Sequence, residues 1–420
     1  MHIFFISEDI PYNGFSGSAL FGWACVNYFI ERGHKITLFV DPPRKNITKK
    51  QYFEQIQNIT KLGCEIVHLN KVKQNKKTNL SKINSFFNPE ISKFYYSCSF
   101  SGSIEKIIKK KVIELNPDIL FVYGFPAIYF TRNINNIPRF APICEDPFTI
   151  SQMKWKLNIN GYRKIRNLFN VFRTLLLSKK IAEHFMKCDL YGQSSEDIRK
   201  NYIKWGAKDC KYYNHPLPYN YTKKNFSKKK IIKKFKIILI GSLSTSTWGQ
   251  YLVLEKYILP YLKNHINDDR YEVHLIGSNK NKRFNNLYDD KNIIFRGYVE
   301  NIENEFRDCD ILLSPTPANC GMRIRILEGF CHGCCIITTK YDQNACPLLI
   351  DNYNSLVAKK LNDLGPLVIN SLNSPKLRKR LSINAQKTFL KNCKPDVTCL
   401  EYEKDMIKLV KTNKKEIHKV

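Results

Sequence analysis

The sequence has no apolar run that approaches the roughly 18 to 20 residues that a bilayer-spanning helix requires. Its first seven residues lack the basic start and the small-residue cleavage site of a secretory signal, and their pattern predicts a strand. The fourteen cysteines are scattered, and no such signal precedes them, so we expect reduced thiols in a cytosolic compartment. These absences predict a cytoplasmic protein, either soluble or peripheral at the inner face of a membrane.

Acidic residues are scarce: 37 Asp and Glu stand against 68 Lys and Arg, which gives a formal net charge of +31. Such an excess favours a nucleic acid, an anionic membrane surface or an acidic substrate as partner. The sequence is also rich in Lys, Asn and Ile, as expected of a genome with a strongly biased base composition. Part of the positive charge would then reflect that bias and would not indicate a binding partner. Because no aromatic-basic RNA motif accompanies the charge, nucleic acid is the least favoured of the three.

The composition is that of a folded protein, with 43% hydrophobic and 13% aromatic residues, and 420 residues are enough for two domains. In the first half, short β-rich runs alternate with longer helical patterns, of which residues 18–32 end at the helix-breaking Gly33. This alternation predicts βαβ units around a mostly parallel sheet. The expected strands are residues 3–7, 36–40, 65–69, 119–123, 140–144 and 190–193, with a further pair at Tyr212 and Tyr213.

The second half repeats the scheme, with strands expected at residues 236–240, 273–276, 293–295, 311–313 and 336–338. We predict a first domain over residues 1–218, a basic linker over 219–235, a second domain over 236–396 and a helical tail over 397–420. Two such domains place a ligand crevice at the carboxyl ends of their strands. No internal repeat at solenoid periods is present.

Residues 314–329 are the most informative stretch, because a Pro- and Gly-marked loop joins an apolar strand to a helix that we expect to begin near Gly321 or Met322. A helix N-terminus attracts phosphate through its free amides and its dipole. Arg325 and Glu328 lie three residues apart and therefore share a helix face. Arg325 provides a cation that could bind a diphosphate, and Glu328 provides a carboxylate that could accept hydrogen bonds from ribose hydroxyls. This combination suggests a nucleotide as ligand, and more specifically a nucleotide-sugar.

Several segments carry a family resemblance when they are taken in order. The chain resembles the group 1 (family 4) glycosyltransferases of the GT-B fold over nearly its full length. The segments are residues 3–7 with the glycines of 14–17, residues 116–120, residues 187–195, and residues 240–243, 275–277, 295–299 and 321–328.

The resemblance implies an α/β protein of two Rossmann-like domains facing each other across a cleft, with the C-terminal helix returning to the first domain. It implies a nucleoside diphosphate-sugar donor in the second domain, an acceptor on the first, and transfer with retention at the anomeric carbon. No cofactor is implied, and a metal is not expected. Carried over to this sequence, Glu328 would bind the ribose. Arg325, together with Arg323, would bind the diphosphate. The other donor-side residues would be Gly17, Gly241, Ser242, Gly277, Tyr298, Val299, Gly321 and Met322.

The sequence departs from the family pattern at three places. Cys320 stands where many members have a second glutamate, and the loop after Gly241 carries hydroxyls in place of an Arg and a Lys. The donor-side histidine of the first domain has no clear match. Glu145 and Asp146 lie near its place, and either they face an acceptor hydroxyl as catalytic carboxylates or they cap the turn at Pro147.

Three other patterns allow two interpretations each. Asp308 and Asp310 have the Asp-x-Asp spacing of a metal site, but a turn is the better interpretation. The cysteines of residues 331–335, together with His332, suggest a zinc site. No second pair of ligands is evident in the sequence, so we favour buried free thiols. We also expect His215 to have a structural role. Residues 162–181 form a basic amphipathic helix that would lie on anionic lipid or pack on its own sheet.

The sequence thus predicts a cytoplasmic glycosyltransferase that serves a glycan or lipid-linked acceptor in surface polysaccharide or glycoconjugate synthesis. The membrane surface stays open as a further partner. Two alternatives also stay open, a GT-B-fold sugar epimerase and a non-catalytic relative that binds a nucleotide-sugar or glycan. The second is suggested by Cys320 and by the cation-poor loop after Gly241.

Overall fold

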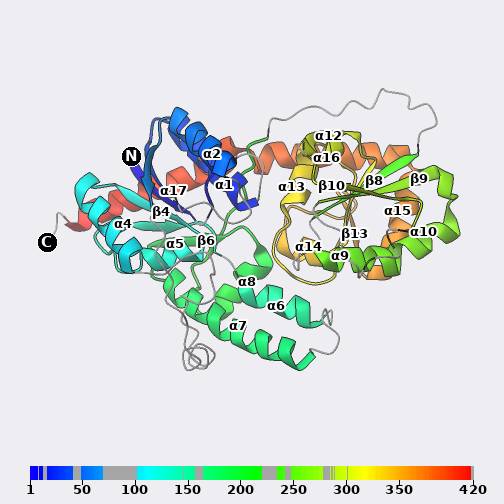
Figure 1. Ribbon diagram of the computed structural model, residues 1–420, viewed down its shortest axis with the longest axis horizontal. Helices are drawn as coiled ribbons and strands as arrows, with labels where there is room; N and C mark the ends of the chain where they lie inside the picture. Colours follow the sequence, from blue (N-terminus) through cyan, green and yellow to red (C-terminus); the bar gives the residue numbers. More distant parts are fainter. Residues whose placement is uncertain are drawn as a thin grey trace.

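The structure is a computed structural model, and it describes residues 1–7, 9–12, 17–40, 49–69, 102–144, 146–156, 164–219, 234–241, 247–277, 284, 287, 289–299 and 301–417. These residues form two parallel sheets, one of seven strands and one of six, each with helices packed around it (Figure 1). Two Rossmann-like domains therefore lie side by side, as predicted.

The first sheet has the strand order β3-β2-β1-β4-β5-β6-β7, and all its pairings are parallel. Its central strands are apolar along their whole length, because helices cover both faces. The strands are β1 (His2–Ser7), β2 (Lys35–Val40), β3 (Glu65–His68), β4 (Ile119–Tyr123), β5 (Arg139–Ala141), β6 (Leu190–Gln193) and β7 (Lys211–Tyr212).

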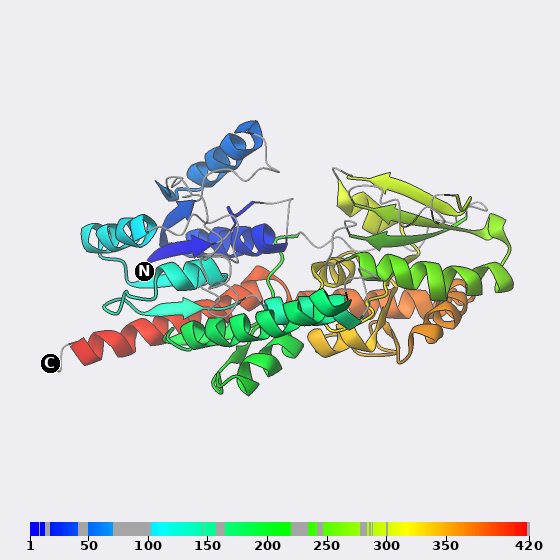
Figure 2. The same ribbon diagram turned by 60° about the horizontal axis from the view of Figure 1, so that its bottom comes forward.

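The helices of the first domain follow the strands in alternation, as a parallel sheet requires. They are α1 (Gly17–Glu31), α2 (Lys49–Lys61), α4 (Gly102–Leu115), α5 (Phe125–Phe130), α6 (Pro147–Lys156), α7 (Lys164–Phe185) and α8 (Glu196–Lys204). Helices α6 and α7 pack on each other and project from the body of the domain toward the second domain (Figures 1 and 2).

The second sheet has the strand order β10-β9-β8-β11-β12-β13, again with parallel pairings throughout. Its strands are β8 (Phe235–Ile240), β9 (Tyr271–Ile276), β10 (Ile293–Gly297), β11 (Ile311–Ser314), β12 (Ile336–Thr339) and β13 (Leu356–Ala358). The strand predictions are confirmed to within two residues, except that β5 ends three residues early and β13 was not predicted.

Helices around the second sheet include one continuous segment in which a π-helical turn, Leu254–Ile258, joins α9 (Trp248–Val253) to α10 (Leu259–His265). The others are α12 (Ile302–Asp308), α13 (Ile324–Cys331), α14 (Lys340–Ala345), α15 (Leu364–Asn373) and α16 (Pro375–Asn392), with short 3-10 turns at Asp268–Arg270 and Leu361–Asp363.

The C-terminal helix α17 (Pro395–Ile417) leaves the second domain and packs on α1 of the first, as the resemblance implied (Figure 1). Cys399, Tyr402 and Met406 of α17 are fully buried in the same apolar cluster as the core of β1, β2 and β4. The chain therefore crosses between the domains twice. Where the two crossings meet, the amide of Leu217 donates to the carbonyl oxygen of Cys393 at 3.0 Å.

The domain boundaries stay predictions in part, because most of the expected linker, residues 220–233, lies outside the described residues. The tail helix begins two residues before the predicted 397. None of the helices in the described part of the chain combines the length and the apolar character that crossing a bilayer requires.

Candidate functional site

The order of the second sheet determines where a ligand can bind. The chain runs outward from β8 to β9 and β10, and then returns to place β11 on the other side of β8. In such sheets the ligand crevice lies outside the carboxyl ends of the two strands at which the order reverses. Here those ends are Ile240 of β8 and Ser314 of β11, and the helix that follows β11 is α13.

Arg325 of α13 reaches this crevice. Its Nη1 donates to the backbone carbonyl of Ile240 and, at 2.6 Å, to Oε1 of Gln250 on α9. Burial, and after it the nearby charge of Arg323, lowers the pKa of Arg325 to about 10, so the guanidinium stays charged at neutral pH. The crevice therefore contains a buried cation at the end of the central strand.

Glu328 lies one turn further along α13 and is also buried. The hydroxyl of Tyr219 donates to its Oε1 at 2.7 Å, from the last described residue before the linker. Burial raises the pKa of Glu328 above the ordinary value of 4.5, although the Tyr219 hydrogen bond and the charge of Arg325 oppose the shift. No direct Arg325–Glu328 ion pair is found among the described contacts, so both side chains are available to a ligand from one helix face.

The helix begins later than predicted, at Ile324, with Arg323 as its N-cap. Gly321 and Met322 thus belong to the loop, and Gly321 has a φ of 80° that strongly favours glycine. The expectation of a helix start at Gly321 or Met322 was wrong by two to three residues. The reason is the backbone conformation: Gly321 has a positive φ and Arg323 is extended, with φ −108° and ψ 110°, so neither residue is helical. The Gly321 amide donates to Oδ2 of Asp197, in α8 of the first domain, at 3.2 Å.

The two domains approach each other closely at a second point. A Cβ built on Gly17, the first residue of α1, would lie 2.6 Å from Cγ1 of Ile324, the first residue of α13. A side chain at position 17 would push the domains apart. Gly17 therefore allows the first domain to approach α13, and its role beside the donor stays a prediction.

Between the domains lies a small recess with an empty volume of about 180 Å³, measured out to its opening. Its lining combines Met153 of α6 with residues of the second domain, namely Thr247, Gly249, Gln250, Thr316, Pro317, Arg323 and Arg325. Pockets for drug-sized ligands measure about 300 to 1,000 Å³. This recess alone is therefore smaller than a pocket for a nucleotide-sugar.

Comparisons with known proteins agree with this geometry. The second domain matches the family model described as Glycosyl transferases group 1 over residues 234–367. The second domain is thus similar to the group 1 glycosyltransferases, and the whole chain has the GT-B fold. No curated protein sequence matches it.

Solved structures resemble the glycosyltransferase over nearly the whole chain, at identities that show the fold alone. HepE of Anabaena, in complex with UDP and glucose, has a TM-score of 0.64 and 12% identity over 97% of this chain and 99% of that one. Sucrose-phosphate synthase of Thermosynechococcus elongatus has a TM-score of 0.68 and 11% identity over 98% and 100%. The lipopolysaccharide outer core galactosyltransferase WaaB has a TM-score of 0.57 and 13% identity over 97% and 99%.

The other predicted donor-side residues of the glycosyltransferase lie around the same sheet edge. Gly241 follows β8, and a Cβ on it would meet Nε2 of Gln250 at 2.6 Å and Nη1 of Arg325 at 3.2 Å. Gly277 follows β9, and its amide donates a hydrogen bond to the carbonyl oxygen of Gly297 at 2.8 Å. Tyr298, which follows β10, is 64% exposed, so its ring is open to a ligand. Val299 and Met322 pack against one apolar cluster of the domain.

Cys320 and Arg323 contact each other, Nη2 of Arg323 lying against the sulfur. Burial raises the pKa of Cys320 to about 11, so a neutral thiol occupies the place where many relatives have a carboxylate. Sequence reasoning missed a buried carboxylate nearby. Asp342 of α14 accepts from Ser314 Oγ at 2.8 Å and Thr338 Oγ1 at 2.7 Å, and its charge acts on both Cys320 and Arg325.

Two predicted residues of the glycosyltransferase, Glu145 and Ser242, lie outside the described residues. Asp146 is described and buried: its carboxylate accepts from the Phe148 amide at 3.0 Å and from Ser178 Oγ at 2.9 Å. It also accepts from Asn201 Nδ2 at 3.0 Å and from the hydroxyl of Thr149. This is the arrangement of a cap for α6, the second of the two interpretations that the sequence allowed.

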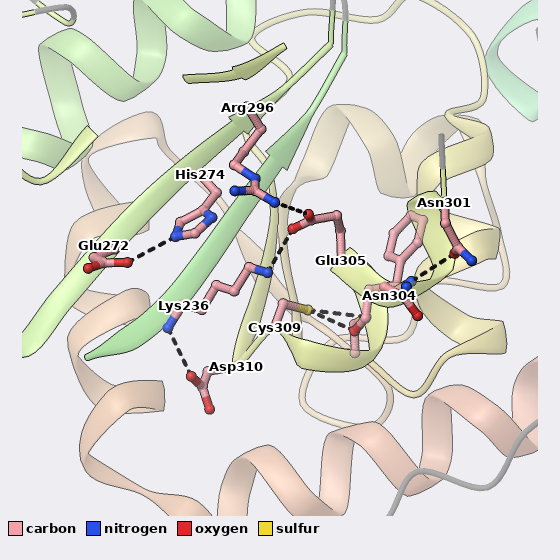
Figure 3. Close-up of polar contacts among 11 residues, drawn as sticks. Lys236, Glu272, His274, Arg296, Asn301, Asn304, Glu305, Cys309 and Asp310 are labelled. Carbon is pink, nitrogen blue, oxygen red and sulfur yellow. Dashed lines mark hydrogen bonds and ion pairs between the residues drawn. The ribbon is translucent and has the colours of Figure 1, made fainter. Parts of the chain in front are cut away.

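The Asp-x-Asp pattern spans the junction of two elements: Asp308 ends α12, and Asp310 precedes β11. Oδ2 of Asp310 accepts from the amide of Lys236 at 2.9 Å, beside an ion-pair cluster in which Glu305 binds Lys236 at 2.7 Å and Arg296 at 3.0 Å (Figure 3). Among the described residues, no three or more His, Cys, Asp or Glu side chains are arranged to hold a metal ion.

The cysteine-rich turn after α13 is packed in the interior. The cysteines in the described part of the glycosyltransferase are free thiols, and all of them except Cys320 are buried. His332 stacks on Phe306 at 5.3 Å between ring centroids. His215 is buried with its ring edge against Phe21, and burial lowers the pKa of His215 to about 4, which fits the structural role expected of it.

Proposed function

We propose that this glycosyltransferase moves a sugar from a nucleoside diphosphate-sugar in its second domain to a hydroxyl of a glycan or lipid-linked acceptor on its first domain. The observation that carries the proposal is the pair Arg325 and Glu328, both buried on one face of α13 at the reversal point of the sheet. A buried cation and a buried carboxylate at that edge suit the two polar parts of a nucleoside diphosphate.

In this proposal Arg325 binds the diphosphate. Its guanidinium leaves the carbonyl of Ile240 and turns to the phosphate oxygens, which offer it charged acceptors in place of a neutral one. Gly241 and Ser242 allow the phosphates to approach the end of β8. Arg323, which lines the recess, adds a second cation, and the loop amides of Gly321 and Met322 face the donor sugar.

Glu328 accepts hydrogen bonds from the ribose hydroxyls, and the hydroxyl of Tyr219 holds the carboxylate in place for them. The exposed ring of Tyr298, with Val299, borders the base beyond β10. Gly277, at the end of β9, leaves room between ribose and sheet. The structure of HepE contains UDP, so a uridine nucleotide is the first donor class to test here.

In the transfer step, the acceptor oxygen forms a bond to the anomeric carbon while the bond from that carbon to the diphosphate breaks. The hydroxyl proton passes to an oxygen of the departing diphosphate, and attack on the face that it leaves retains the configuration. Negative charge grows on the diphosphate, and Arg325 stabilises it in a site from which domain closure excludes water. No cofactor takes part, and the proposal requires no metal.

On the acceptor side, Glu145 would face the acceptor hydroxyl, while Asp146 acts as a positioning residue. Its carboxylate fixes the start of α6, whose Met153 forms the wall of the recess on the side of the first domain. We place the reaction in the cytoplasm, in the assembly of a surface polysaccharide or glycoconjugate. That placement follows from the family resemblance and from the basic surface.

Calorimetric titration of the full chain with UDP, GDP, ADP and CMP tests the proposal. One nucleotide should bind, and Arg325→Lys and Glu328→Gln should each weaken it by about tenfold or more. Glu272→Gln is the matched control, since Glu272 is a half-exposed carboxylate near the start of β9, paired with His274, and should leave affinity unchanged. Binding of no nucleotide by the folded protein, or equal effects of Glu272→Gln and Glu328→Gln, would overturn the donor site.

A further inference from the structure

Helices α6 and α7 carry an unusual surface. Four of the large hydrophobic side chains that the described residues expose lie on this hairpin: Trp155 is 40% exposed, Leu168 51%, Phe169 55% and Phe172 59%. Single exposed apolar residues are ordinary, whereas a group of three aromatic rings and a leucine on one pair of packed helices marks an interaction site.

The exposed residues of α7 share one face. Residues 168, 169 and 172 lie within an arc of about 100° at the helical period, and residues 175 and 176, which are half-buried, continue the stripe. The opposite face holds α7 on its domain through the buried side chains of Leu177, Ile181 and Phe185. The stripe thus lies on the side of α7 away from the described core of the first domain. Tyr162 and Ile165, also part of the predicted stripe, have no described side chain.

The same hairpin is strongly cationic. Its two helices contain seven Lys and Arg residues and one acidic residue, Glu183. Lys156 is exposed next to Trp155, and Lys179 is exposed two turns after Phe172 on the same helix face. An apolar stripe with cations at its border is the pattern of a helix that lies in the interface of an anionic bilayer.

We propose that the α6–α7 hairpin docks the enzyme on an anionic membrane surface, with Trp155, Leu168, Phe169 and Phe172 inserted between headgroups and the lysines on the phosphates. A second copy of this chain would be a poor occupant, because a two-fold contact would bring two such cationic hairpins together. Docking of α6 also has a consequence for the site. Met153, two residues before Trp155, lines the recess, so the membrane would lie next to the path of a lipid-linked acceptor.

Vesicle flotation of the full chain tests this inference without donor or acceptor, so its outcome is independent of the proposed function. The protein should bind phosphatidylcholine vesicles that contain phosphatidylglycerol and should bind pure phosphatidylcholine vesicles far more weakly. Raising the salt from about 0.1 M to about 0.5 M should reduce binding, because screening shortens the reach of the lysine charges.

Two variant pairs separate the apolar and the charged contributions. The double variant Leu168→Ser with Phe172→Ser should weaken vesicle binding by at least about tenfold. Its control is Phe53→Ser with Ile113→Ser, at positions on α2 and α4 that are 61% and 81% exposed, and this control should not weaken binding. Lys156→Glu with Lys179→Glu should also weaken it by more than about tenfold. Lys376→Glu with Lys387→Glu, on exposed positions of α16, changes the net charge equally and should have a much smaller effect.

Unchanged melting temperatures show that the variants are folded. Absence of binding to anionic vesicles would overturn the inference, as would equal effects of each pair and its control, because net charge alone would then explain the binding. Self-association that Leu168→Ser with Phe172→Ser abolishes, without vesicle binding, would assign the patch to a second copy and would likewise overturn it.

Discussion

The amide of Gly321 donates a 3.2 Å hydrogen bond to Oδ2 of Asp197, across the boundary between the two domains. The loop before α13 is thus tied to the first turn of α8 in the first domain. Ser195 Oγ donates to the other oxygen of the same carboxylate at 2.6 Å, and burial raises the pKa of Asp197. The carboxylate therefore joins the two domains through its hydrogen bonds, although burial disfavours its charge.

Asp197→Asn should therefore shift the protein toward an open arrangement, because the neutral amide accepts the Gly321 hydrogen bond more weakly than the carboxylate does. Small-angle scattering should show a larger radius of gyration, and kcat/KM should fall. Glu196→Gln is the control: Glu196 is the neighbouring residue, and it forms ion pairs with Arg199 and Lys200 of its own helix. Equal scattering curves for the two variants would rule out the interdomain role of Asp197.

Gly321→Ala should have a larger effect than Asp197→Asn. The φ of 80° disfavours any side chain, and a Cβ would lie 3.0 Å from Cδ1 of Ile198. We expect a fall in melting temperature of about 2–4 °C for each 1 kcal/mol lost. Combining Gly321→Ala with Ile198→Ala removes the steric contact but not the backbone strain, so it should restore part of the loss. Full restoration of the melting temperature would show that backbone strain at position 321 does not contribute to the loss of stability.

The Tyr219–Glu328 hydrogen bond predicts the behaviour of Tyr219→Phe. Without the hydroxyl, a buried carboxylate loses a donor, so the pKa of Glu328 should rise further and nucleotide affinity at neutral pH should fall by about tenfold. Calorimetric titration measures this, with Tyr257→Phe, at a half-exposed tyrosine of the π-helical turn, as control. Equal affinities in the two variants would mean that Tyr219 does not orient Glu328.

Glu328 should show a trade-off between stability and binding. Its folded-state pKa is raised, so its contribution to the free energy of unfolding is fully present below about 4.5 and is lost as the pH rises through the raised value. Glu328→Gln should therefore raise the melting temperature at neutral pH while it weakens nucleotide binding. Acidification should remove the stability difference, and an equal or lower melting temperature of the variant at neutral pH would contradict the raised pKa.

The sequence predicted most strands because a parallel sheet covered on both faces needs continuous apolar runs, as in β4 and β11. Strand β13 was missed because its three apolar residues form too short a run between the polar Ser355 and Lys359. Arg325 and Glu328 could be predicted because their spacing on one helix is local.

Contacts that join distant segments could not be predicted. Gln250, Tyr219 and Asp197 meet α13 and its loop from residues 75, 109 and 124 positions away along the chain. Nothing in the sequence near each of these residues indicates its partner. The predicted helix start was wrong because Gly321 takes a positive φ and Arg323 an extended conformation, and the loop sequence does not indicate either.

The return of α17 to the first domain predicts a pH-dependent stability. Glu403 of α17 accepts from His34 at 2.8 Å and from Tyr28 at 3.0 Å, and pairs with Arg32 at 3.4 Å. Burial would raise the pKa of Glu403, but these contacts outweigh it and the pKa is lowered. The stabilisation is thus present above about 4.5 and is lost as the pH falls through the lowered value.

Glu403→Gln should reduce the free energy of unfolding by about 1–3 kcal/mol at neutral pH, because a charged acceptor becomes neutral. Denaturant titrations over a pH series should show that the difference from the wild type shrinks below about 4.5 as Glu403 itself becomes protonated. Glu401→Gln, two residues away, is a control of opposite sign, since burial raises the pKa of Glu401 and its removal should not destabilise the protein at neutral pH. A Glu403 effect that does not change with pH would show that the docking of α17 depends on packing and not on this ion pair.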